Sequence, residues 1–386
     1  MNRNKKFLAG VVFTLTGLLM TQPLLALEVD REVTPRITLG GKLVSTVDSV
    51  NFDSDPAGSD HISMEDSMIL LRFDKRLYQS GVAGAVLGIE EEDNVTRFQQ
   101  LHAFYWARDM KLEIGRTRLR NTLIEFPLLR DEDLLSYTHV TNASSNEKFD
   151  QIYGELISAD WYIDRKVLRL GAWAGSRRNG FPGAPVGLDS QGISYVYEQP
   201  EDLFYVSRWR HAGIRLDRQQ VDVSGVTEWQ QALLAGFEIN LNMDPQSNWS
   251  LSVQAMINDG VDGAVGLVTV ADRAQIAAQS LVASIRYVAR PHLLTRWQAA
   301  VTVATMNYSD IDNTSQWSIV PSLFYRIGQG VDLLAQASYT DYDVALFGGG
   351  SDVRLQLGIA FSLETVFNDN IGERDSILNL EHGYIQ

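Results

Sequence analysis

The segment Val353-Arg-Leu-Gln-Leu-Gly-Ile-Ala-Phe-Ser-Leu363 alternates large apolar residues with polar or small ones. Because successive side chains of a β-strand point to opposite faces, its odd-numbered residues share one face, and Arg354, Gln356 and Ser362 share the other. A soluble sheet buries its apolar face in a core, whereas a strand of a membrane barrel turns that face to lipid. The meaning of the pattern therefore depends on how often it recurs.

Segments of the same kind recur from residue 36 onward, and tight turns rich in Gly, Pro, Asn, Asp or Ser join many of them in pairs. They predict an all-β fold, a transmembrane antiparallel up-and-down β-barrel of about 16 strands. So many similar strands without continuous core-forming runs argue against a soluble sandwich. The predicted strands are 36–48, 67–78, 81–92, 99–107, 110–118, 151–163, 166–175, 190–198, 204–216, 231–243, 248–258, 278–289, 294–306, 315–326, 330–341 and 353–367.

The remaining connections between the predicted strands are mostly longer and polar. In membrane barrels the long loops face the outside of the cell and the short turns face the periplasm, so loop length predicts the orientation. Aromatic residues near predicted strand ends, among them Trp161, Trp249 and Trp317, favour interfacial girdles. The predicted external connections are 49–66, 93–98, 119–149, 176–189, 217–230, 259–277, 307–314 and 342–352.

The two ends of the chain differ from the barrel pattern. Residues 1–26 predict a secretory signal peptide, because three cations precede an apolar run that is short for a membrane-spanning helix and ends near the small residue Ala26. Residues 27–367 are the predicted barrel. Residues 368–386 are apolar for a linker and are predicted to be a periplasmic C-terminal tail or a closing segment.

Composition excludes several classes of protein. The chain has no cysteine, which rules out disulfides, a lipoprotein anchor and Cys-based metal or redox sites. Its formal charge is −15, and removal of the three signal-peptide cations makes it −18 (−15 minus 3), which argues against nucleic acid as a partner. The mean hydropathy of −0.11 and the lack of a later long apolar run exclude a helical membrane protein.

The connection 119–149 is the longest and has an unusual composition. It follows the strand end Gly115-Arg-Thr-Arg-Leu-Arg120, where alternation points Arg116 at lipid unless Gly115 marks a bulge. Folding back into the lumen would bury its many apolar residues, which are poorly suited to exposure in an external loop. These residues are Leu123, Ile124, Phe126, Leu128, Leu129, Leu134 and Leu135.

The Gly-Arg-x-Arg strand end, Asn121, Glu125, Pro127 and the Arg130-Asp131 pair together resemble the bacterial outer-membrane porin superfamily, including its phosphate-selective and general diffusion porins. The resemblance implies that the third external loop folds inward and narrows a water-filled channel. It assigns the acidic side of that constriction to Glu125, Asp131, Glu132 and Asp133.

Cations on the polar faces of the predicted strands would supply the basic side of the pore lumen. Opposed charges across a narrow passage create a transverse field that orients dipolar solutes. Acids also occupy polar faces, for example Asp74, Glu113 and Glu238, so a mosaic of salt-bridged lumen residues is an open alternative to a basic stripe. The predicted basic residues are Lys42, Arg72, Arg76, Arg169, Arg208, Arg210, Arg286, Arg296, Arg326 and Arg354.

The resemblance implies a Gram-negative outer-membrane porin for passive diffusion of small hydrophilic solutes or ions, with anion preference expected from the arginine-rich inner face. Its expected partners are outer-membrane lipid, lipopolysaccharide and two further copies in a homotrimer, and no nucleic acid. The alternatives are a barrel enzyme of lipid hydrolase or protease type, and a non-conducting structural or adhesin barrel. Because no nucleophile elbow or His-Glu-x-x-His pattern accompanies the six histidines, we predict no enzyme, cofactor or metal site.

Overall fold

The computed structural model describes residues 35–367 with gaps, so the predicted signal peptide and tail lie outside the described residues. In the described part, no helix is long and apolar enough to cross a membrane. The gaps are 53–54, 65–66, 78–80, 93–94, 108, 121–122, 125, 130–150, 164–167, 177–189, 200–206, 224–225, 245, 262–275, 291–295, 309–314, 329 and 343–349.

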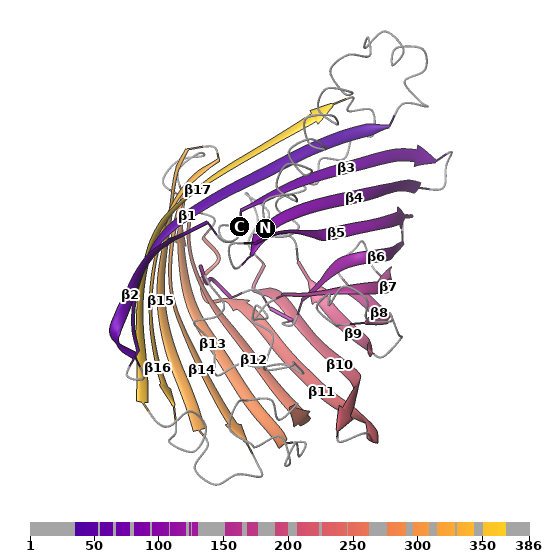
Figure 1. Cartoon of the computed structure of the whole chain (residues 1–386). Coiled ribbons are helices and arrows are strands. Elements are labelled where there is room, and N and C mark those ends of the chain that lie inside the picture. Colours follow the sequence, from indigo (N-terminus) through magenta and orange to yellow (C-terminus); the bar gives the residue numbers. More distant parts are fainter. Residues whose placement is uncertain are drawn as a thin grey trace, which may run out of the picture.

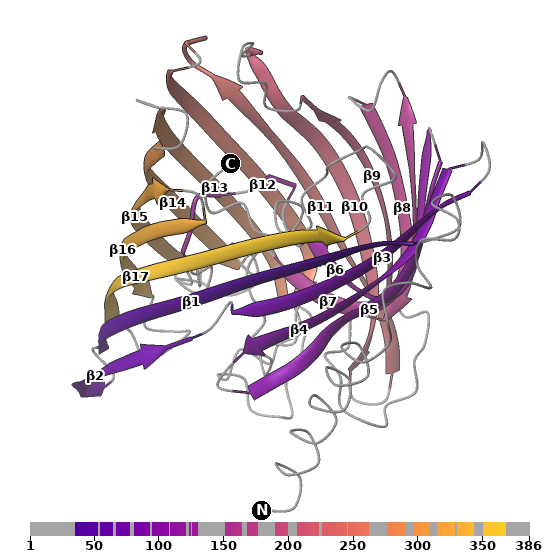
Figure 2. The ribbon, with the colours of Figure 1, turned by 90° about the horizontal axis from the view of Figure 1, so that it is seen from above.

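The described residues form one antiparallel sheet whose strands tilt around a common axis (Figures 1 and 2). From β3 to β17 each strand pairs with the next one along the chain, while β2 and β3 both pair with β1. β17 also pairs with β1, which closes the sheet into a barrel. The strands are β1 (Arg36–Phe52), β2 (Asp55–Ser63), β3 (Met68–Leu77), β4 (Gly81–Glu92), β5 (Val95–Trp106), β6 (Met110–Arg120), β7 (Gln151–Ile163), β8 (Leu168–Ser176), β9 (Ser190–Glu198), β10 (Trp209–Val223), β11 (Val226–Asn240), β12 (Ser247–Val261), β13 (Ile276–Ala289), β14 (Arg296–Tyr308), β15 (Ser315–Gly328), β16 (Val331–Tyr342) and β17 (Gly350–Phe367).

Two of these strands share one position, so the barrel has the 16 strand positions that the sequence predicts. β2 pairs with residues 46–52 of β1, and β3 pairs with residues 36–42 of the same strand. At the break between β2 and β3, the side chain of Ser67 replaces the missing backbone pairing. The Val44 N–H donates to Ser67 Oγ at 2.9 Å, and the Ser67 hydroxyl donates to the Val44 carbonyl at 3.1 Å.

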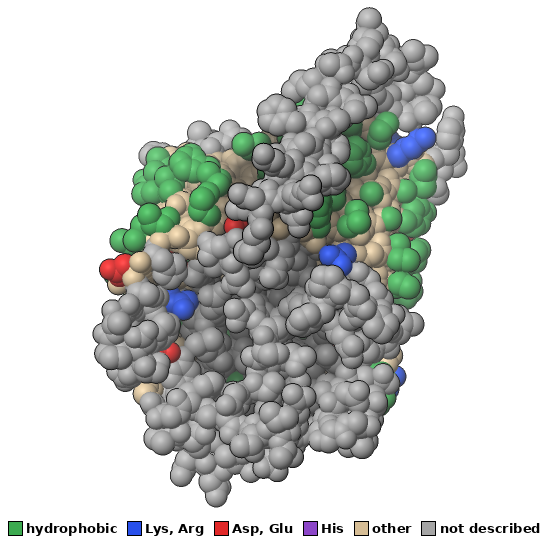
Figure 3. Space-filling model, in the orientation of Figure 1, with side chains coloured by type: hydrophobic (Ala, Val, Ile, Leu, Met, Phe, Trp, Pro, Cys, Tyr) green, Lys and Arg blue, Asp and Glu red, His purple; other side chains and the backbone are tan. Residues whose placement is uncertain are grey.

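The two faces of the wall have the polarity of a membrane barrel. On β17, Leu355 and Leu357 are 49% and 54% exposed, whereas Gln356 between them is 0% exposed. Figure 3 shows hydrophobic side chains gathered on the flanks of the wall. Because a soluble protein would bury the leucines and expose the glutamine, the outer face is suited to lipid and the inner face to a polar interior.

Aromatic side chains lie in rows on the outer face near the strand ends. Close to the turn after β11, Tyr287 contacts Trp249 and Trp297, with ring centroids 4.8 and 5.0 Å apart. Trp317 on β15 and Tyr339 on β16 lie near the other end of the barrel, with ring centroids 5.2 Å apart. Two separated rows are the expected arrangement of aromatic girdles at the two surfaces of a membrane.

Most predicted strands are confirmed, and three (81–92, 151–163 and 190–198) have the bounds of β4, β7 and β9. Three predicted connections are wrong in large part. Residues 49–52 and 55–63 belong to β1 and β2, 93–98 is mostly β5, and 217–230 is mostly β10 and β11. Their polar residues indicate loops, but cross-strand hydrogen bonding extends the sheet through them.

Arg116 points outward, as strict alternation predicts. Gly115 has a positive φ of 129°, yet the pairing of β6 with β5 and β7 runs through it without a register shift. Arg116 therefore stands opposite Leu101, which is 62% exposed on the outer face. Its Nη1 donates to the Phe98 carbonyl at 3.3 Å, which satisfies part of the guanidinium outside the lumen.

Candidate functional site: the inner face of the barrel

Buried polar side chains cover much of the inner face. Gln254 on β12, Gln298 on β14 and Gln356 on β17 are each 0% exposed, and serines and threonines occupy many inner positions between them. Charged side chains concentrate toward the ends of the strands where the short turns lie.

The ten predicted lumen cations differ in their surroundings. Lys42, Arg72 and Arg286 are buried on the inner face. Arg169, Arg210, Arg296, Arg326 and Arg354 are half-buried. Arg76 is exposed on β3 near its end, and Arg208 is exposed just before β10, which starts at Trp209 and not at the predicted residue 204.

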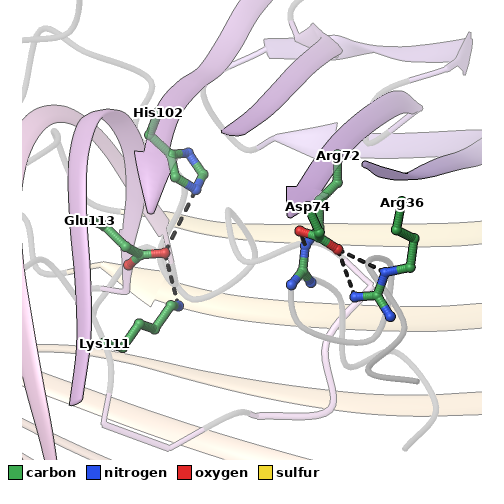
Figure 4. A network of polar contacts seen from close by, with 6 residues as sticks. All are labelled: Arg36, Arg72, Asp74, His102, Lys111 and Glu113. Atoms are coloured by element: carbon green, nitrogen blue, oxygen red, sulfur yellow. Dashed lines mark hydrogen bonds and ion pairs between the residues drawn. The ribbon is translucent and has the colours of Figure 1, made fainter. Parts of the chain in front are cut away.

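Asp74 on β3 binds two arginines (Figure 4). Arg36 donates to Asp74 Oδ2 from Nε at 2.9 Å and from Nη2 at 2.6 Å, and Arg72 Nε donates to Oδ1 at 2.7 Å. The Arg72 guanidinium also lies over the ring of Phe104, 4.9 Å from its centroid. Two guanidinium groups share one carboxylate, so this triad carries a net charge of +1. Arg36 was absent from the predicted set, although it shares the inward parity of Lys42.

A second triad of two arginines and one carboxylate lies on β10, β11 and β13. Glu238 on β11 accepts from Arg210 Nη1 at 3.1 Å and from Arg286 Nη2. Arg286 Nε also donates to Ser250 Oγ at 3.1 Å. This triad again combines two cations with one anion and has a net charge of +1.

Other predicted cations form neutral pairs. Arg326 makes two hydrogen bonds with Asp332, at 2.8 and 3.1 Å, and Arg169 lies 3.7 Å from Asp160. The inner face therefore has features of both sequence-based alternatives, since neutral salt-bridged pairs coexist with two triads that each combine two arginines and one carboxylate.

A third network joins β5, β6 and β7 and is drawn beside the first triad in Figure 4. Glu113 Oε1 lies 2.8 Å from Lys111 Nζ and 3.6 Å from His102 Nε2. Ser158 Oγ donates to the other oxygen of Glu113 at 3.4 Å. This arrangement has no nucleophile aligned with the histidine, because the serine hydroxyl bonds the carboxylate.

The sequence pattern missed an inner cluster on β8 and β10. Arg215 Nε lies 2.7 Å from Asp217 Oδ2, and Trp173 Nε1 donates to Asp217 Oδ1 at 3.2 Å. Pairing of β10 with β11 shifts register between Trp209 and His211. A bulge of this kind reverses which alternate residues face inward, so Arg215 faces inward although its parity differs from that of the predicted lumen residues Arg208 and Arg210.

The described part of connection 119–149 packs against the inner face of the wall. Leu123, Ile124 and Leu128 form one buried apolar cluster with inner residues of β9 and of β11 to β15. Leu129 packs into a second cluster with Phe324 and other inner residues. The wall residues of the first cluster are Val196, Ala232, Leu234, Met256, Val282, Ala304 and Val320.

The predicted acidic constriction residues Glu125, Asp131, Glu132 and Asp133 lie outside the described residues. Within the part of the chain that is described, no group of three or more His, Cys, Asp or Glu side chains is arranged to hold a metal ion.

A closed barrel with an apolar outer face and a charged interior defines the class of transmembrane β-barrels. No protein-family model matches the chain, and no curated protein matches it. Solved structures do match. The anion-selective porin from Comamonas acidovorans is 15% identical with a TM-score of 0.58, covering 85% of this chain and 99% of that chain.

Two further solved structures show the same likeness. The outer-membrane channel DcaP of Acinetobacter baumannii is 11% identical with a TM-score of 0.56, covering 85% of this chain and 97% of that chain. OmpF of Salmonella typhi, solved with daunomycin, is 12% identical with a TM-score of 0.54, covering 86% and 98%. The chain therefore has the fold of bacterial outer-membrane porins.

Proposed function

We propose that this protein is an outer-membrane porin that forms a water-filled channel for passive diffusion of small hydrophilic solutes. The observation that carries the proposal is the inverted polarity of a closed barrel. Leucines face outward on β17 while Gln356 is fully enclosed, and networks of charged residues lie on part of the inner wall. A channel needs such a polar interior to hydrate and select its solutes, and a barrel with 16 strand positions is wide enough for an aqueous lumen.

We propose that the channel prefers anions. The two triads around Asp74 and Glu238 each keep one positive charge beyond their own carboxylate. Lys42 is also buried on the inner face of β1. A low-dielectric passage focuses the field of such charges, so anions are enriched in it.

The proposal includes a constriction formed by the connection 119–149. Its support is the packing of Leu123, Ile124 and Leu128 against the inner wall. The neighbouring Glu125 and Asp131, with Glu132 and Asp133, would then lie across the passage from the basic residues. Opposed charges at that point would orient dipolar solutes.

Location and assembly are also part of the proposal. Residues 1–26 would be removed on export, the barrel would lie in the outer membrane among lipid and lipopolysaccharide, and three copies would form the unit. One of the matched solved structures, OmpT of Vibrio cholerae, is a trimer form. The matched structures that are named by activity are porins and channels, which supports a protein that is not an enzyme.

A swelling assay tests solute passage. Liposomes containing the mature protein, residues 27–386, should swell in isotonic solutions of small sugars and should stop swelling as the sugar becomes larger than the channel. Liposomes made with the heat-denatured protein are the control. If the folded barrel gives no more swelling than this control with any sugar, the proposed diffusion function is wrong.

A further inference from the structure

The segment Leu123–Leu129 is bound to the wall at both of its ends through backbone groups. Gln254 on β12 accepts from the N–H of Leu123 at 2.6 Å and from that of Ile124 at 3.3 Å. Gln336 on β16 accepts from the N–H of Leu129 at 2.6 Å. Since these two glutamines stand four strands apart, the segment is held along the inner face and not at a single point.

Between the two ends, the wall matches the segment in both polarity and shape. Ser322 on β15 donates to the Pro127 carbonyl at 2.7 Å. On β11, a Cβ placed at Gly236 would lie 2.7 Å from Cδ1 of Ile124, so glycine leaves the space that this side chain occupies. Apolar side chains that face inward are unfavourable in a wall exposed to water. The inward cluster and Gly236 are instead suited to a segment that stays packed against them.

The side chains of Gln254 and Gln336 are buried, and that of Gln336 is oriented by a further hydrogen bond. Both are almost fully buried, at 0% and 2% exposed. Gln336 Nε2 donates to Gln356 Oε1 at 3.1 Å, which orients its carbonyl oxygen toward the segment. The unpaired backbone N–H groups of an irregular segment are costly to bury, and these two acceptors satisfy those at its ends.

We propose that Gln254 and Gln336 are positioning residues that fix the segment Leu123–Leu129 as an immobile part of the channel wall, so that the cross-section of the pore is set by these two side chains. This inference rests on the proposed channel function. It predicts a fixed constriction that the wall holds in place, and not a loop that moves in the lumen.

The first test replaces both acceptors with apolar side chains of similar size, Gln254→Leu with Gln336→Leu. Single-channel recording of the mature protein should show a larger mean conductance and a broader spread of step sizes. The sugar size limit in the swelling assay should rise. The matched control is Gln298→Leu, since Gln298 is a fully buried inner glutamine whose side chain makes no hydrogen bond within the described residues, and this variant should conduct like the wild type.

The outcomes distinguish failure of the proposed channel function from failure of the role proposed for Gln254 and Gln336. A wild type that never conducts refutes the proposed function. A conducting wild type whose double variant keeps the same step size, spread and sugar limit refutes the role of the two glutamines alone.

A second test begins with the wild-type glutamines, so its first part does not depend on the glutamine variants folding. The chain has no cysteine, so the pair Ile124→Cys and Gly236→Cys introduces a single possible disulfide. We expect it to form in the folded barrel, with equal conductance before and after reduction. In the Gln254→Leu, Gln336→Leu background, oxidation should restore the wild-type step size. Failure of the disulfide to form, or a lower conductance when it is closed, would overturn a fixed segment.

Discussion

Asp74 shows what a single buried charge contributes to the inner wall. Its carboxylate is 0% exposed and is held by Arg36 and Arg72 from two paired strands. The three groups compensate one another, so the carboxylate links β1 to β3 and also lowers the positive charge of the lumen by one unit. If the proposed channel function holds, stability and ion preference depend on the same residue.

Replacing Asp74 with asparagine should affect both properties. The substitution leaves two buried guanidinium groups without their anion, and breaking a buried pair in this way costs about 3–5 kcal/mol. We expect a lower urea midpoint for loss of the folded, slow-migrating band on gels, and a stronger anion preference in bilayers. The control is Asp60→Asn, because Asp60 is exposed on β2.

An unchanged midpoint in Asp74→Asn would contradict the role given to the triad. The double variant Arg72→Gln, Asp74→Asn should lose less stability than Asp74→Asn alone, because it also removes one of the two guanidinium groups that the carboxylate binds.

At the scale of the element, the irregular strands are where sequence and structure disagree. Period-two alternation predicted β4, β7 and β9 at their observed bounds, and the pairings of β7 and β9 show no register shift. It failed on β10, where the register shift between Trp209 and His211 changes the face of every later residue and hid Arg215. Bulges depend on pairing with neighbouring strands, which the local sequence pattern does not encode.

The join between β2 and β3 was missed for the same reason. Residues 55–63 are rich in Asp, Ser and Gly, a composition typical of loops, and their strand conformation depends on pairing with β1. Of the apolar residues of 119–149, Leu123, Ile124, Leu128 and Leu129 are buried in clusters with wall residues, and Leu134 and Leu135 lie outside the described residues, so the inward-folded loop as a whole stays a prediction. The inner-face partners Leu234, Met256 and Val282 were not predicted, because polar inner faces were expected throughout.

Ser67→Ala tests whether the join stabilises the barrel. Loss of the hydroxyl leaves the N–H and carbonyl of Val44 without their partner, which costs about 1–3 kcal/mol for buried groups. We expect a lower urea midpoint with unchanged single-channel conductance, and recovery of the midpoint in Ser67→Thr. Ser49→Ala on the exposed outer side of β1 is the control. Equal midpoints for Ser67→Ala and the control would show that the hydroxyl bridge is dispensable.

At the scale of the whole molecule, the inner wall has two different parts. From β11 to β16 the middle of the inner face is uncharged among the described residues, and the segment Leu123–Leu129 packs there. The charged side chains lie on the remaining strands and toward the ends with short turns, as in the triads of Asp74 and Glu238. We therefore expect ions to follow the charged part of the wall.

The central claim, a water-filled channel that prefers anions, is tested most directly by single-channel recording of the refolded mature protein in a planar bilayer under a potassium chloride gradient. The account predicts discrete, stable conductance steps and a reversal potential displaced toward the equilibrium potential of chloride. A reversal potential displaced toward that of potassium would contradict the anion preference. A correctly folded, heat-modifiable barrel that never conducts would contradict the channel itself.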